Sequence, residues 1–113
     1  MATVIQFSSN DLPPGHCRAY TTDAHIVMVY NLGGEFFATQ GVCTHEDLPL
    51  AGGRFAENVM ECPHHGSRFN IRTGKVLTPP AEMNLPTFPV RVEGGTVTVI
   101  LSRETSNSKP QSP

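Results

Sequence analysis

Two short segments near the middle of the chain each place a cysteine close to a histidine. The first reads Cys-Thr-His at 43–45, the second reads Cys-Pro-His-His at 62–65, and sixteen residues separate them. Thiolate and imidazole are ligands of zinc and of iron–sulfur clusters, and in both kinds of site the ligands must converge on one point. The fold must therefore bring these two segments together.

Short segments of β type make up most of the remaining chain. Ten glycines and ten prolines among 113 residues divide runs rich in Val, Ile, Phe, Tyr and Thr, which is typical of an all-β protein with many turns. Gly94-Gly95 predicts a tight hairpin, and the two prolines at the end of 77–80 predict a loop there. The predicted strands are 3–7, 17–22, 25–32, 35–39, 58–62, 68–70, 90–93 and 96–101.

The apolar alternation is clear before about residue 40 and after about residue 86, but weak between them. We therefore predict one domain, residues 1–103, in which a β core carries an inserted metal-binding lobe at about 41–82. Such a lobe buries little apolar area, so metal bonds would have to offset the chain entropy lost on ordering it. Residues 104–113 contain no large apolar side chain and predict a disordered tail.

Charge and hydropathy exclude several classes of function. Charged residues are 16% of the chain and the formal net charge is -2, so no basic field is available to bind nucleic acid or an anionic membrane. The chain shows neither a signal peptide nor an apolar run of about 20 residues. These features predict a cytoplasmic protein that is not membrane-bound.

The three cysteines differ in their surroundings. An odd number of cysteines argues against a disulfide scaffold. Cys17 has no partner at metal-binding spacing, and we interpret it as a small buried hydrophobic residue.

The spacing of the remaining two cysteines bears on the kind of metal. Structural zinc sites with two cysteines and two histidines commonly have one Cys-Cys half and one His-His half, whereas here each segment supplies one of each. A mixed pair allows both thiolates to bind one iron and both histidines a second, as in a Rieske [2Fe-2S] centre. A zinc-stabilised interaction module remains the alternative.

The pattern C-x-H, sixteen residues, C-x-x-H-G resembles the Rieske family. The flanking text CTHEDLPLAGGRF, ECPHHGSRFNIRTGKVLTPPA and FPVRVEGGTV is similar to the small Rieske ferredoxins of bacterial aromatic-ring dioxygenase systems, over about 11–101. The resemblance implies a Rieske-like antiparallel β-sandwich with an inserted cluster-binding lobe and one [2Fe-2S] cluster. It implies Cys43 and Cys62 on the inner iron and His45 and His65 on the outer iron, with coordination through His64 as the alternative.

The same resemblance implies a function. The protein would be a monomeric one-electron carrier, without catalysis of its own, from an NAD(P)H-dependent flavin reductase to a terminal aromatic-ring-hydroxylating oxygenase. The small Rieske subunit of an assimilatory nitrite reductase is the alternative within the same class. We also expect an apolar collar for docking around the cluster, formed by Leu48, Pro49, Leu50, His64, Pro79 and Pro80.

The resemblance also implies a low reduction potential. In high-potential relatives, two extra cysteines form a disulfide between the loops, and a serine and a tyrosine donate hydrogen bonds to cluster sulfurs. Here the two cysteine positions read Leu48 and His64, Ser67 matches the serine, and Phe69 replaces the tyrosine. The potential is therefore predicted at the low end of the range of about -150 to +300 mV for Rieske centres.

Overall fold

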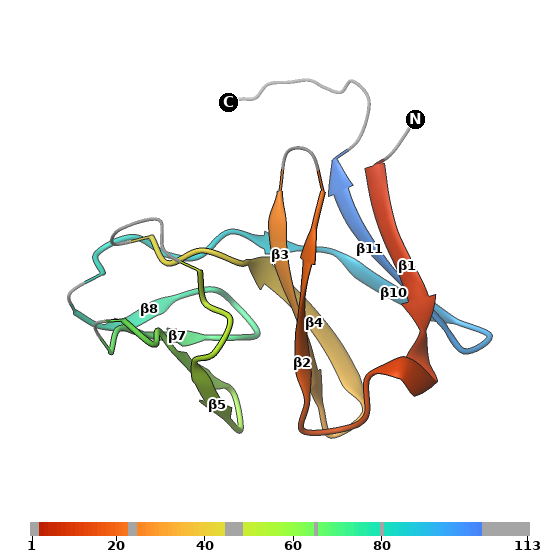
Figure 1. Cartoon of the computed structure of the whole chain (residues 1–113), viewed down its shortest axis with the longest axis horizontal. Coiled ribbons are helices and arrows are strands. Elements are labelled where there is room, and N and C mark those ends of the chain that lie inside the picture. Colours follow the sequence, from red (N-terminus) through yellow and green to blue (C-terminus); the bar gives the residue numbers. More distant parts are fainter. Residues whose placement is uncertain (1–2, 23–24, 45–48, 65, 80, 103–113) are drawn as a thin grey trace.

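The computed structural model describes residues 3–22, 25–44, 49–64, 66–79 and 81–102 as three antiparallel sheets (Figure 1). The first sheet has the order β1-β11-β10, the middle sheet β2-β3-β4-β9, and the lobe sheet β5-β6-β7-β8. One turn of 3-10 helix, η1 (Ser9–Asp11), follows β1. The strands are β1 (Thr3–Ser8), β2 (Cys17–Thr21), β3 (Ile26–Leu32), β4 (Glu35–Gln40), β5 (Arg54–Ala56), β6 (Val59–Glu61), β7 (Arg68–Asn70), β8 (Val76–Thr78), β9 (Thr87–Phe88), β10 (Val90–Glu93) and β11 (Thr96–Ser102).

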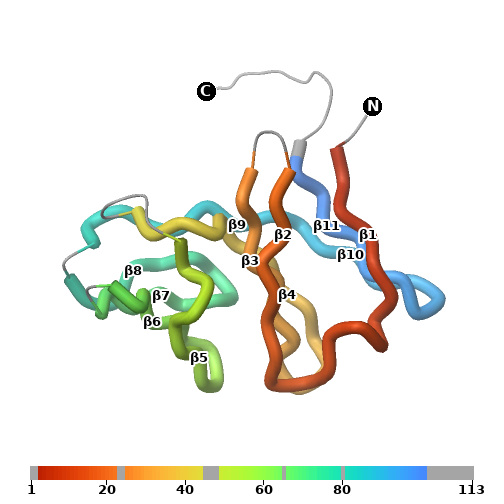
Figure 2. The backbone as a smooth tube through the Cα atoms, viewed as in Figure 1, coloured from red at the N-terminus to blue at the C-terminus, as the bar shows by residue number. Residues whose placement is uncertain are grey.

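The middle sheet lies between the other two sheets (Figure 2). The chain leaves it after β4, forms the whole lobe sheet, and returns to pair β9 with β4. The first sheet, which contains β1 and β11, lies on the side away from the lobe. The lobe is thus an insertion into the middle sheet, in agreement with the predicted fold class.

Strand β3 is buried on both faces. Side chains alternate across a strand, and here Val27 and Val29 pack toward the first sheet while Met28 and Tyr30 pack toward the lobe. All four are buried. This explains why β3 reads as a continuous apolar run instead of an alternating one.

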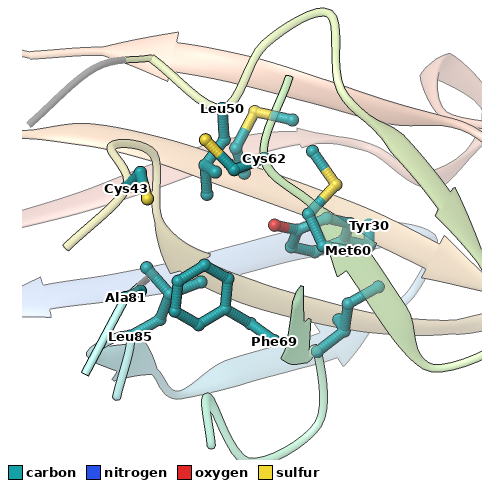
Figure 3. Packing of buried hydrophobic residues seen from close by; sticks show 10 residues of the cluster. Tyr30, Cys43, Leu50, Met60, Cys62, Phe69, Ala81 and Leu85 are labelled. Atoms are coloured by element: carbon teal, nitrogen blue, oxygen red, sulfur yellow. The ribbon is translucent and has the colours of Figure 1, made fainter. Parts of the chain in front are cut away.

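Two hydrophobic cores result. The sandwich core fills the space between the first and middle sheets and contains Ile5, Leu12, Val27, Val29, Ala38, Val99 and Leu101. The lobe core joins the middle sheet to the lobe and contains Met28, Tyr30, Cys43, Leu50, Met60, Cys62, Phe69, Ile71, Ala81 and Leu85 (Figure 3). Both sulfur atoms of the predicted cysteine ligands therefore belong to a packed interior.

A buried polar pair lies within the lobe core. The hydroxyl groups of Tyr30 and Thr39 are 2.9 Å apart, and Thr39 donates to the carbonyl oxygen of Gln40 at 2.9 Å. Tyr30 is therefore the donor to Thr39. Burial raises the pKa of Tyr30 above its ordinary value, so the phenol stays protonated and keeps this bond.

Arg72 connects the lobe to the middle sheet. Its Nε donates to Oδ1 of Asn58 at 2.9 Å, its Nη2 lies 3.1 Å from Oε1 of Glu35, and its guanidinium lies 4.7 Å from the centre of the Phe37 ring. An exposed ion pair alone contributes little, but Arg72 joins one turn of the lobe to two residues of β4. This arrangement restricts how the lobe rotates against the middle sheet.

The all-β prediction is confirmed, and so is the hairpin between β10 and β11, where Gly94 and Gly95 have φ angles of 57° and 81°. The loop predicted at 77–80 is wrong in part, because Leu77 and Thr78 belong to β8. This strand is at the edge of the lobe sheet and ends before Pro79, where a missing backbone donor is tolerated. The predicted tail, 104–113, lies outside the described residues.

No helix within the described ranges combines the length and the apolar character that crossing a bilayer requires.

Candidate metal centre

Cys43 and Cys62 lie on two loops that begin at the ends of β4 and β6. In the first loop, Val42 and Pro49 form an isolated antiparallel bridge, and the N–H of Leu50 donates to the carbonyl oxygen of Gly41 at 2.8 Å. These contacts hold the two arms of the first loop together.

The second loop is closed by its own backbone. The N–H of Cys62 donates to the oxygen of Ser67 at 2.8 Å, and the N–H of Gly66 donates to the oxygen of Cys62 at 3.1 Å. Gly66 has a φ of 79°, a left-handed conformation that glycine adopts without steric cost. These contacts bring Gly66 and Ser67 back to Cys62 immediately after β6.

The structure brings the two predicted cysteine ligands together. Cys43 and Cys62 are 2% and 1% exposed and belong to the same lobe core, where Figure 3 shows them on the side away from Met60 and Tyr30. The other two predicted ligands, His45 and His65, lie outside the described residues. The structure therefore gives the position and burial of the two predicted cysteine ligands only.

Ser67 has no solvent exposure, and its Oγ accepts a hydrogen bond from the N–H of Ala81 at 3.0 Å. This bond ties the second loop to the segment that follows β8. Because Oγ acts there as an acceptor, the hydroxyl proton remains available for an acceptor on the buried side of the loop.

His64 is exposed, and its Nε2 lies 3.2 Å from the carbonyl oxygen of Pro49. A carbonyl oxygen only accepts, so Nε2 carries the proton in this bond. The side chain therefore connects the second loop to the first. His64, which the sequence leaves as an alternative ligand, thus has a structural role in this contact between the loops.

Replacing His64 with alanine is expected to preserve cluster assembly and to make the cluster less durable. Losing one hydrogen bond costs about 0.5–1.5 kcal/mol, so bleaching by a chelator should be about two- to tenfold faster. His16→Ala is the matched control, since Nδ1 of His16 makes a similar 3.2 Å contact with Pro14, in the turn before β2. Absorbance at visible wavelengths follows the loss. A His64→Ala protein that assembles no cluster would show that His64 is a ligand.

The expected apolar collar is wrong at Leu50, which has no solvent exposure and belongs to the lobe core. Pro49, His64 and Pro79 are exposed, whereas Leu48 and Pro80 lie outside the described residues. The sequence analysis missed Met83, which is 68% exposed and whose carbonyl oxygen accepts from Oγ1 of Thr44 at 2.7 Å. Met83 lies between β8 and β9, outside both strands, so no alternation of apolar residues in the sequence could have predicted its exposure.

Cys17 packs against the lobe core from β2 and is partly buried. Burial raises the pKa of its thiol above the ordinary value. Since the thiolate is the form that binds metals, this environment favours the packing role predicted for Cys17.

Comparison with known proteins bears on the nature of this site. Residues 2–89 match the family described as the Rieske [2Fe-2S] domain. The chain belongs to this family. A Rieske domain carries one [2Fe-2S] cluster, held by two cysteines and two histidines, and the two buried cysteines described above come from the two loops that the Rieske pattern requires.

Two curated relatives of this chain are ferredoxin components of biphenyl dioxygenase systems. The chain is 44% identical over 101 residues to the ferredoxin component of biphenyl 2,3-dioxygenase from Rhodococcus jostii (strain RHA1), which covers 89% of this chain and 94% of the relative. It is 42% identical over 97 residues to the biphenyl dioxygenase ferredoxin subunit of Pseudomonas sp. (strain KKS102), covering 85% and 89% of the two chains.

Solved structures agree with this placement. A chain in a complex of reduced oxygenase and oxidised ferredoxin of carbazole 1,9a-dioxygenase superposes with a TM-score of 0.82 at 32% identity, covering 91% of this chain and 97% of that one. The small subunit of a putative NADH-dependent nitrite reductase from Mycobacterium tuberculosis superposes with a TM-score of 0.78, but at 18% identity it shares the fold alone.

The described residues fit a Rieske cluster. The lobe core provides two thiol groups shielded from water, the second loop turns at Gly66 without a side chain, and Ser67 has a hydroxyl proton to donate. Phe69, at the position where a tyrosine would donate, is fully buried and has no hydroxyl. Of the two side-chain hydrogen-bond donors that the resemblance implies, the serine is therefore present and the tyrosine is absent.

Proposed function

We propose that this chain is the Rieske ferredoxin of an aromatic-ring-hydroxylating dioxygenase system. It carries single electrons from an NAD(P)H-dependent flavin reductase to the terminal oxygenase. The observation that supports this most strongly is the 44% identity to a biphenyl 2,3-dioxygenase ferredoxin component, 94% of whose length is matched. The nitrite reductase alternative is supported by a likeness of fold at 18% identity, and the dioxygenase proposal is therefore favoured.

In this proposal each protein group has a distinct role. Cys43 and Cys62 would hold the inner iron, and His45 and His65 would hold the outer iron. The cluster, when bound, accepts and releases one electron at a time. The lobe core excludes water from the cysteines, and the hydrogen bond between His64 and Pro49 holds the two loops in register.

Three further properties belong to the same proposal. The chain acts as an electron carrier in the cytoplasm, is monomeric, and catalyses no reaction of its own. The relatives named as ferredoxin components of dioxygenase systems support the carrier role. Analytical ultracentrifugation of the holoprotein tests the monomer directly.

Spectroscopy tests the proposed function. The purified protein is expected to be brown, to contain iron and acid-labile sulfide, and to give a Rieske-type EPR signal with a low average g value after dithionite reduction. It should then reduce a dioxygenase oxygenase component in the presence of NADH and a ferredoxin reductase. A colourless protein with stoichiometric zinc and no sulfide would favour the zinc-stabilised module. Stable co-purification with a large reductase subunit would favour the nitrite reductase alternative.

Replacing Ser67 with alanine is expected to lower the midpoint potential, because a donor to a cluster sulfur stabilises the added electron. A hydrogen bond to a charged group contributes about 1.5–3 kcal/mol and a one-electron potential shifts by about 59 mV per tenfold change, so the fall should be about 60–130 mV. Redox-titrated EPR measures it, with Ser9→Ala as the control. An unchanged potential would show that Ser67 does not donate to the cluster, and a wild-type value well above about +100 mV would contradict the predicted low potential.

A further inference from the structure

A row of three charged residues crosses the outer face of the lobe sheet. Arg54 on β5 is directly opposite Glu61 on β6, and Glu61 is directly opposite Arg68 on β7. Directly paired residues project from the same face of a sheet. The neighbouring residues Met60 and Phe69 are buried in the lobe core, so this row, which we name the charged row, is on the opposite, outer face.

The charged row has a net positive charge and is exposed. Nε of Arg68 lies 3.5 Å from Oε1 of Glu61, and the two side chains are 56% and 39% exposed. Within the described part of the chain, no carboxylate forms an ion pair with Arg54. An exposed ion pair contributes little to stability, so Arg68 can exchange Glu61 for a carboxylate of another protein at small cost.

A hollow of about 420 Å³ adjoins the charged row beside the second loop. It is lined by Arg54 and Glu61, by Cys62 and Pro63, and by glycines at 52, 53 and 66. The three glycines contribute backbone only, so a side chain from a partner can enter without displacing a side chain of this protein. The hollow therefore connects the charged row to Cys62, a predicted cluster ligand.

We propose that the charged row and the adjoining hollow recognise an acidic surface on the terminal oxygenase. Two arginines on either side of one glutamate match carboxylates on the partner, since arginine binds carboxylate groups in a bidentate manner. Electrostatic complementarity of this kind raises association rates and selects partners. A ferredoxin at 32% identity has been solved in complex with an oxygenase, which favours the oxygenase over the reductase as the occupant. The inference rests on the proposed function.

Stopped-flow kinetics with opposite charge changes test this surface. Dithionite-reduced holoprotein is mixed with the oxygenase component of the Rhodococcus jostii biphenyl 2,3-dioxygenase, and one electron passes from the ferredoxin cluster to the oxygenase. The double variant Arg54→Glu with Arg68→Glu should slow the second-order rate about tenfold or more at low ionic strength. Glu61→Gln should accelerate it. High salt should remove both differences, because screening shortens the Debye length to about 3 Å at 1 M.

Arg91→Glu is the control for net charge, with half the charge change of the double variant. Arg91 is exposed on β10, in the first sheet, and its substitution changes the net charge in the same direction away from the lobe. Its rate should stay within about twofold of the wild type, and each protein should keep the wild-type EPR spectrum.

The outcomes separate this inference from the proposed function. A double variant no slower than Arg91→Glu, or a loss confined to reduction by the flavin reductase, would overturn the oxygenase surface while leaving the electron-carrier function intact. A wild-type protein that holds a Rieske cluster yet reduces no oxygenase would overturn both.

Discussion

The Cys62→Ala protein is expected to contain no [2Fe-2S] cluster. Cys62 is 1% exposed and belongs to the same lobe core as Cys43, the other predicted thiolate ligand. Alanine supplies no donor to replace the missing thiolate. Acid-labile sulfide should fall from about two per chain to none, together with the visible absorbance and the EPR signal of the reduced protein. Cys43→Ala should behave in the same way.

Cys17→Ala is the matched control, because it removes a thiol that packs against the same core from β2. Its sulfide content and EPR spectrum should equal those of the wild type. A Cys62→Ala protein that keeps its sulfide would remove the residue from the ligand set, and a Cys17→Ala protein that loses it would place Cys17 there instead.

The Gly74→Ala substitution is expected to open the lobe. Gly74 has a φ of 78°, and a methyl group there would overlap the carbonyl oxygen of Leu85. Its N–H donates to Asn70 and its carbonyl oxygen accepts from Leu85, both at 2.7 Å. The left-handed conformation costs alanine about 1–2 kcal/mol, and overpacking adds about 1–3 kcal/mol. The temperature at which visible absorbance is lost should therefore fall by several degrees or more.

Gly33→Ala measures the conformational cost alone, so the difference between the two variants gives the steric cost at Gly74. Gly33 also has a positive φ, 64°, but no atom lies within 4 Å of the position that its Cβ would occupy. It should therefore cost only the conformational part, about 1–2 kcal/mol. Equal destabilisation by the two substitutions would show that contact between Gly74 and Leu85 does not close the lobe.

Local sequence signals predicted those parts of the fold in which a pattern acts over a few residues. The Gly94-Gly95 turn and the run of β3 are of this kind, since turn geometry and burial leave direct marks on composition. Strands β5, β8 and β9, of two or three residues, were not predicted, although β6 and β7, of three residues each, were. Their pairing depends on neighbours that are distant in the sequence.

The candidate site likewise has features that the sequence predicted and features that it did not. Spacing and family resemblance indicated four ligands, and the structure places Cys43 and Cys62 together in one core. Other features depend on how separate loops and strands meet. They are the burial of Leu50, the contact between His64 and Pro49, and the charged row. Such tertiary contacts leave no periodic signal in one sequence.

The two-sided burial of β3 has a consequence for biogenesis. Val27 and Val29 anchor the strand in the sandwich core, and this fixes Met28 and Tyr30 on the other face. The platform on which the lobe rests can therefore form before iron and sulfide arrive. We therefore expect cluster assembly to act on an open lobe above a folded scaffold.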